Sequence, residues 1–110
     1  MPLAKLEPII SERLVATPDQ IHEFCQRWKI NEMSLFGSVL RSDFHADSDI
    51  DVLVSFAGDA EWNLFDYVHM QNELSALVRR KVDIAEKHGL INPYRRHAIL
   101  STCQSLYKAE

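Results

Sequence analysis

The hydrophobic and polar positions between residues 49 and 56 alternate with a period of two, which is typical of a β-strand. Residues 33–36 and 81–86 are also strand-like, and Gly37 ends the first of these two segments. The pattern therefore predicts three strands. In the longest strand, one face carries Ile50, Val52, Val54 and Phe56, and the other carries Asp49, Asp51, Leu53 and Ser55.

Apolar residues at helical spacing predict four helices. The first is an amphipathic segment over residues 3–14. The second begins at Thr17, where Pro18 and Gln20 complete the pattern of a capping box. A long helix follows over residues 61–79. Asn92-Pro93 begins the last helix, in which Ile99, Cys103 and Leu106 are expected to face inward.

These elements predict an α+β (α/β) fold with a small mixed β-sheet packed against helices, which are expected to cover one side of the sheet. The chain has 110 residues, enough for one hydrophobic core, and a single domain over residues 1–110 is expected. Its 46% hydrophobic and 25% charged residues are typical of a globular protein.

The charge balance bears on the substrate. There are 12 Lys and Arg residues against 16 Asp and Glu residues, a net charge of −4. A protein that grips long nucleic acid needs a basic face, so such a substrate is not expected. We interpret the two small basic groups, Arg79-Arg80-Lys81 and Arg95-Arg96, as helix-end or solvated residues.

The chain also lacks an apolar run of the roughly 18 residues that cross a membrane, and its N-terminus has no signal-peptide pattern. A cytoplasmic protein without a membrane partner is therefore expected. Cys25 and Cys103 are interpreted as free thiols, since they have neither metal-ligand spacing nor an oxidising context.

The start of the long predicted helix carries more apolar surface than one stripe requires. Two interpretations are open: a core that packs on both sides of the helix, or an interface with a partner protein. The residues concerned are Trp62, Leu64, Phe65 and Val68.

Asp49 and Asp51 point to the same face of their strand because side chains alternate along it. Two carboxylates on one face repel each other, and a divalent cation removes that repulsion. Carboxylate oxygens favour Mg²⁺ or Mn²⁺. The pair therefore predicts a metal site.

Gly37 and Ser38 predict a phosphate-binding turn. Glycine permits the backbone to approach a ligand closely, and Ser38 offers a hydroxyl and an N–H. If residues 38–41 open a helix, further free N–H groups point outward, and helix N-termini bind phosphate. Arg41 can add a cation beside the turn, or it can be a solvated residue of that helix.

Asp83 is the third candidate, a carboxylate on the polar face of a separate predicted strand. If that strand lies beside the strand of Asp49 and Asp51, Asp83 can bind a second metal or accept the proton of an attacking hydroxyl. Two metals about 4 Å apart stabilise an in-line displacement. The predicted reaction is attack of a hydroxyl on the α-phosphorus of a nucleoside triphosphate.

Phe36-Gly37-Ser38, ten residues and then Asp49-Ile50-Asp51 resemble the G-S-x10-D-x-D signature of the polymerase-β-like nucleotidyltransferases. The short chain is most similar to the minimal nucleotidyltransferases, or MntA-like antitoxins. Members commonly read G-S-R-A-R-G at the turn. This chain keeps Arg41 at the second arginine, but has Val39 at the first and Ser42 at the closing glycine.

The resemblance implies roles for these residues: Asp49, Asp51 and Asp83 as catalytic metal ligands for Mg²⁺, with two ions expected, and Gly37 and Ser38 as the phosphate turn for ATP. It also implies a partner, a HEPN-domain toxin, which receives AMP on a tyrosine hydroxyl. About 25 residues follow Asp83, which leaves room for one helix, so the acceptor is expected on another protein. The alternatives are an antitoxin that neutralises by binding alone and a nucleotidyltransferase for a small molecule such as an antibiotic.

Overall fold

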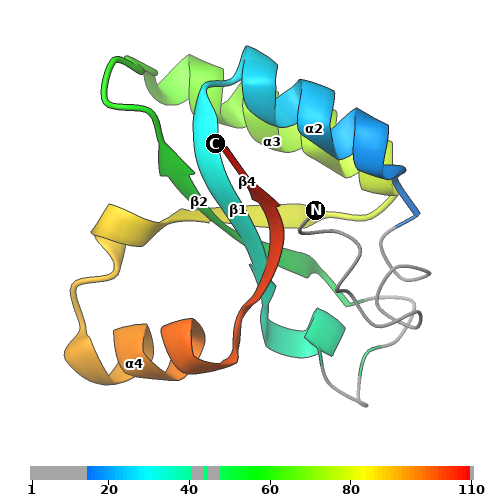
Figure 1. Ribbon diagram of the computed structural model, residues 1–110. Helices are drawn as coiled ribbons and strands as arrows, with labels where there is room; N and C mark the ends of the chain where they lie inside the picture. Colours follow the sequence, from blue (N-terminus) through cyan, green and yellow to red (C-terminus); the bar gives the residue numbers. More distant parts are fainter. Residues whose placement is uncertain (1–14, 41–43, 45–47, 110) are drawn as a thin grey trace.

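The computed structural model describes residues 15–40, 44 and 48–109 of the chain (Figure 1). The helix predicted over residues 3–14 lies outside them. The elements follow in the order α2 (Pro18–Arg27), β1 (Ile30–Phe36), the 3-10 helix η2 (Gly37–Leu40), β2 (Ile50–Phe56), α3 (Leu64–Val78), β3 (Val82–Glu86), the 3-10 helix η3 (Lys87–Gly89), α4 (Pro93–Thr102) and β4 (Gln104–Lys108).

The four strands form one mixed sheet in the order β3-β2-β1-β4. β1 is antiparallel to both of its neighbours, β2 and β4, whereas β2 and β3 are parallel. The predicted mixed sheet is thus confirmed. The parallel pair follows from the connection between its strands, because α3 crosses over the sheet between β2 and β3.

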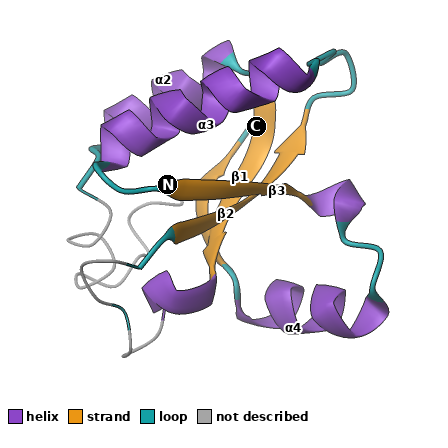
Figure 2. Ribbon diagram, turned by 180° about the vertical axis from the view of Figure 1, so that it is seen from behind, coloured by secondary structure: helices purple, strands orange, loops and turns teal. Residues whose placement is uncertain are grey.

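α2 and α3 lie together over one face of the sheet (Figures 1 and 2). Phe24 and Cys25 of α2 and Met70 and Leu74 of α3 are almost fully buried there. The strands contribute the residues of their apolar alternation, so one contiguous core forms between the two layers. From β2 and β3, these are Ile50, Val52, Val54 and Val82.

The opposite face of the sheet carries a smaller apolar cluster, against which α4 packs. The expectation that helices cover one side alone is therefore wrong. Ile99 of α4 reaches the sheet because residues of β1 and β2 that face away from α2 and α3 are also apolar. The cluster consists of Phe36, Leu53, Leu90 and Ile99.

Capping residues set the starts of the helices. Thr17 and Gln20 form the predicted capping box of α2, with Pro18 in the first turn. Asn63 begins α3 through a second capping box. The side chain of Asn92 accepts hydrogen bonds from the first free N–H groups of α4. The predicted start of this helix at Asn92-Pro93 is thus confirmed.

The end of the chain differs from the prediction. The last helix stops at Thr102, and Leu106 lies in β4 instead of on the helix. Cys103 has an extended backbone, with φ −64° and ψ 152°, and begins the turn toward β4. Pairing with β1 gives this segment a ladder of hydrogen bonds that local spacing cannot reveal.

Three apolar side chains at the start of α3 are exposed: Leu64 by 75%, Phe65 by 82% and Val68 by 51%. For these three the interpretation as a two-sided core is wrong. Trp62 differs, because its ring packs against Trp28 and its indole N–H donates to the Trp28 carbonyl over 3.0 Å.

Both cysteines are free thiols, as expected. Burial raises the pKa of the Cys25 thiol to about 12, so this thiol stays protonated at neutral pH. In the described part of the chain, none of the helices has the length and apolar character needed to cross a membrane.

Candidate active site

The two halves of the sequence motif meet where the central strand β1 ends and its neighbour β2 begins. Because β1 and β2 are antiparallel, the end of β1 lies beside the start of β2, and Phe36 is the register partner of Asp51. Gly37 follows Phe36 directly, and Asp49 immediately precedes β2. Residues separated by a ten-residue stretch in the sequence therefore become neighbours in space.

Gly37 is packed against the carboxylate of Asp51. Its φ angle of +76° lies in the left-handed region, which side chains rarely adopt. A Cβ atom at this position would overlap Oδ2 of Asp51 and lie 3.3 Å from its Cγ. Glycine is thus required for its conformation and for the space that the carboxylate fills, and the second requirement was not visible in the sequence.

Ser38 ties the turn to the acidic segment. Its hydroxyl donates a hydrogen bond of 3.4 Å to the backbone carbonyl of Asp49. The helix considered for residues 38–41 is a 3-10 helix over Gly37–Leu40. Val39 is fully buried in the core beneath α2 and α3, so the residue at the family's first arginine position has a packing role here. Arg41 and Ser42 lie outside the described residues.

The strand register brings Asp51 and Asp83 side by side. They are partners in the parallel ladder between β2 and β3, where neighbouring strands lie about 4.8 Å apart. Both belong to the face of the sheet that α4 partly covers, since Leu53, two residues beyond Asp51, packs in the α4 cluster. Asp51 is half-buried and Asp83 is exposed.

Arg80 holds the segment that leads into Asp49, a role that sequence reasoning missed. One guanidinium nitrogen donates to the Ser48 carbonyl over 3.2 Å, and the guanidinium carbon lies 4.3 Å from the centre of the Phe44 ring. The N–H of Ile50 donates to the Lys81 carbonyl beside it over 2.9 Å. From the sequence, Arg80 is interpreted as a helix-end or solvated residue, and no local pattern signals its contact with Ser48.

The donor set fits a hard divalent cation. Asp51 and Asp83 offer neighbouring carboxylate oxygens, because they are partners in adjacent strands. Asp49 lies two residues before Asp51, immediately ahead of β2. Within the described residues, no three His, Cys, Asp or Glu side chains already converge as a ready metal-binding group. Mg²⁺ commonly takes only one or two carboxylates, and completes its shell with water and substrate phosphate. Two adjacent carboxylates therefore suffice for one ion.

Comparison with known proteins identifies the family of the chain. Residues 19–106 match the nucleotidyltransferase domain family, so the chain belongs to that family. The chain is 31% identical over 77 residues to MJ0126 of Methanocaldococcus jannaschii, which is provisionally named a protein adenylyltransferase; the match covers 70% of this chain and 76% of that one. It is 32% identical over 68 residues to the protein adenylyltransferase MntA of Thermococcus cleftensis, covering 62% and 67% of the two chains.

Solved structures agree on the fold. A provisionally assigned minimal nucleotidyltransferase superposes with a TM-score of 0.63 at 30% identity, covering 80% of this chain and 85% of its own. A toxin–antitoxin crystal structure with AMP-PNP gives a TM-score of 0.68 at 18% identity, covering 86% and 75%. The expected polymerase-β-like nucleotidyltransferase fold is therefore confirmed.

Proposed function

We propose that this chain is a Mg²⁺-dependent protein adenylyltransferase that transfers AMP from ATP to a tyrosine hydroxyl of a HEPN-domain toxin, and so acts as its antitoxin. The observation that carries the proposal is the packing of the Gly37 turn against Asp51, with Asp83 as the register partner of that acid. A phosphate turn and neighbouring carboxylates are the two parts that nucleotidyl transfer requires.

The relatives support the choice of a protein acceptor. The related chains of Thermococcus cleftensis and Methanocaldococcus jannaschii bear protein adenylyltransferase names. One structure of similar fold is a tri-AMPylated HEPN toxin of Shewanella oneidensis in complex with its MNT antitoxin, with a TM-score of 0.60 at 16% identity. ATP is favoured as the nucleotide because these names specify adenylyl transfer.

The chain's own residues have separate tasks in the reaction. Gly37 and Ser38 form the turn that would receive the triphosphate, and Asp49 and Asp51 would hold Mg²⁺, with Asp83 as the register neighbour of Asp51. When bound, Mg²⁺ neutralises charge that develops on the phosphate oxygens. The tyrosine oxygen forms a bond to the α-phosphorus, and the bond from that phosphorus to the β-phosphate oxygen breaks and releases pyrophosphate. Asp83 accepts the hydroxyl proton, whose ordinary pKa is about 10.

The test is an intact-mass measurement on the HEPN-domain toxin after incubation with this protein, ATP and Mg²⁺. Adducts of AMP mass are expected, and they should disappear in the Asp49→Asn and Asp51→Asn variants. Asp19→Asn is the matched control, because Asp19 is an exposed acid in the first turn of α2. It should leave the adducts unchanged.

The same experiment addresses the alternative of neutralisation by binding alone. That alternative has one observation in its favour, the burial of Val39 at a position where the family commonly has an arginine. If the toxin is neutralised without any adduct, and neutralisation survives both Asp→Asn substitutions, the enzymatic proposal is wrong. Transfer of AMP to a small hydroxylated molecule instead of the toxin would favour the third class.

A further inference from the structure

The C-terminal part of this acidic protein is basic. Residues 1–86 contain 15 Asp and Glu residues against eight Lys and Arg, whereas residues 87–109 contain four Lys and Arg, two His and no acid. Much of this basic segment is η3 and α4. Lys87 pairs with Glu32 over 3.4 Å, but within the described residues neither Arg95 nor Arg96 forms an ion pair. Uncompensated positive charge is thus concentrated on α4.

Two large apolar side chains are exposed beside these arginines. Ile91 precedes α4 and is 88% exposed, and Tyr94 in its first turn is 87% exposed. Tyrosine and arginine are enriched where protein interfaces have their strongest contacts. The combination is therefore more typical of a protein-binding surface than of a surface that merely keeps the protein soluble.

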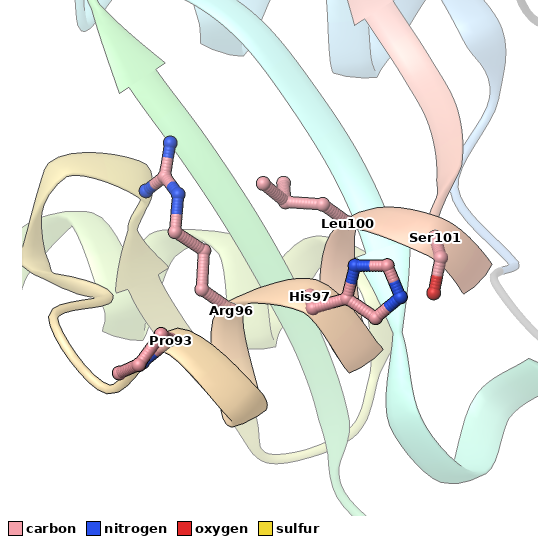
Figure 3. Close-up of a pocket in the computed structure, with 5 residues that line it drawn as sticks. All are labelled: Pro93, Arg96, His97, Leu100 and Ser101. Carbon is pink, nitrogen blue, oxygen red and sulfur yellow. The ribbon is translucent and has the colours of Figure 1, made fainter.

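A shallow hollow of about 440 Å³ lies along the same helix. Figure 3 shows the side chains that line it, with the guanidinium of Arg96 directed away from the helix axis. That guanidinium donates to the Lys87 carbonyl over 3.0 Å, which fixes its position. The hollow thus combines a positioned cation with apolar and polar walls, and its lining residues are Pro93, Arg96, His97, Leu100 and Ser101.

This surface lies on the same side of the sheet as the acids. Ile99 of α4 packs in one cluster with Leu53 of β2. Asp51 is two residues from Leu53 along the strand, a separation of about 7 Å. A protein segment bound along α4 would therefore lie on the same side of the sheet as the carboxylates that we propose for phosphoryl chemistry.

We propose that the α4 face, which comprises Ile91, Tyr94, Arg95, Arg96 and His97, docks an acidic segment of the acceptor protein and so brings its hydroxyl to Asp51 and Asp83. This inference rests on the function proposed above and specifies the partner's chemistry. Charge complementarity selects an acidic occupant. A protein is favoured over RNA because two arginines neutralise few phosphates, whereas the exposed Ile91 and Tyr94 supply apolar anchors.

The test measures binding of the HEPN-domain toxin to the Asp51→Asn variant, so that affinity is measured without turnover. Adding Tyr94→Ser and Arg95→Glu should weaken toxin binding at least about tenfold and reduce its dependence on salt. The matched control combines Gln26→Ser with Lys108→Glu. It changes an exposed side chain of α2, on the other face of the sheet, and reverses an exposed charge on β4, and it should change the affinity less than about twofold.

Thermal unfolding of both variants checks that each is folded, and Arg95→Gln alone serves as a milder variant with an intermediate loss. Toxin binding that is unchanged in the α4 variants, or lost in the control instead, overturns the docking proposal. Single-stranded RNA that binds the chain more tightly than the toxin, and is lost with Arg95→Glu, also overturns it. Failure of the proposed adenylyl transfer gives a different result: the toxin binds the wild-type chain but never acquires AMP.

Discussion

The two faces of the sheet differ in how completely they are covered. Among the described residues, the face under α2 and α3 holds a contiguous core of 16 buried residues, whereas the face under α4 holds a cluster of four. The acids Asp51 and Asp83 belong to the second face. The extensive core supplies most of the hydrophobic stabilisation, and the sparse face leaves room for carboxylates that a full core would have to exclude.

The comparison explains why the acids can occupy a central strand. β2 has partners on both sides, and one of its faces is wholly apolar. Its other face contributes Leu53 to the smaller cluster under α4. The alternation of one strand therefore serves stability on one side and carries a proposed catalytic acid, Asp51, on the other. The expected effects of substitutions differ accordingly between the two faces.

The largest expected effect is on stability at the face under α2 and α3. Leu74→Ala in α3 should lower the free energy of unfolding by about 4 kcal/mol, because it leaves a cavity in the contiguous core. Leu90→Ala removes the same atoms from the four-residue cluster and should cost about 2 kcal/mol. Urea denaturation of both variants measures the difference. Equal losses would show that the two faces contribute alike.

At the other face, Gly37→Ala should cost about 2 kcal/mol of stability and abolish adenylyl transfer. The alanine is strained at a φ of +76°, and its Cβ would displace the carboxylate of Asp51. Gly89→Ala is the control, because a Cβ there meets no atom within 4 Å. Chemical denaturation and the toxin mass assay report the two effects. An active Gly37→Ala protein would contradict the proposed packing.

Arg80→Ala should weaken Mg²⁺ binding about tenfold while it leaves the fold intact, since residues that orient metal ligands typically have effects of this size. The loss of its bond to the Ser48 carbonyl frees the segment before Asp49. Lys81→Ala removes an adjacent cation that is exposed, and should have little effect. The readout is the rise in thermal midpoint during a Mg²⁺ titration. Identical titrations for the two variants would rule out a positioning role.

The smallest expected effect involves an ion pair of the helix layer. Arg27 lowers the pKa of Glu73 below its ordinary value of 4.5, chiefly by donating a hydrogen bond, and the indole N–H of Trp28 contributes a second one. The resulting stabilisation is therefore present above pH 4.5 and is lost as the pH falls through the lowered pKa. Because Arg27 is half exposed, the effect should stay below about 1 kcal/mol.

Unfolding free energies between pH 6 and pH 3 test this prediction. The wild type should lose more stability over that range than Glu73→Gln, whereas Glu61→Gln, at an exposed acid, should follow the wild type. A Glu73→Gln curve parallel to that of the wild type would show that the pair contributes nothing.

Sequence reasoning predicted what local patterns encode. The capping residues Thr17 and Asn92 and the alternation of β2 depend on neighbours within a few positions, and the structure contains all three. The sequence predicts that Asp83 lies beside Asp51 only if their two strands are neighbours. In the structure they are neighbours, and the parallel register pairs these two residues.

Features that depend on distant contacts were missed. The segment around Leu106 has helical spacing, but its pairing with β1 makes it a strand. α4 packs on the second face because Phe36 and Leu53 are apolar there. The same apolar residues would also suit a strand that is buried on both faces, so they do not reveal which helix covers them. Arg80 contacts Ser48 across 32 positions, and no periodicity reports such a bond.

The strand order has a consequence for local motion. The Gly37 turn and Asp51 emerge from β1 and β2, which are hydrogen-bonded on both sides, whereas Asp83 lies on the edge strand β3. Amide hydrogens of central strands exchange slowly because they are released only by larger opening events, while edge strands fray more readily. The Gly37 turn and Asp51 are therefore attached to strands whose amides should exchange slowly. Asp83 belongs to the strand that should open first.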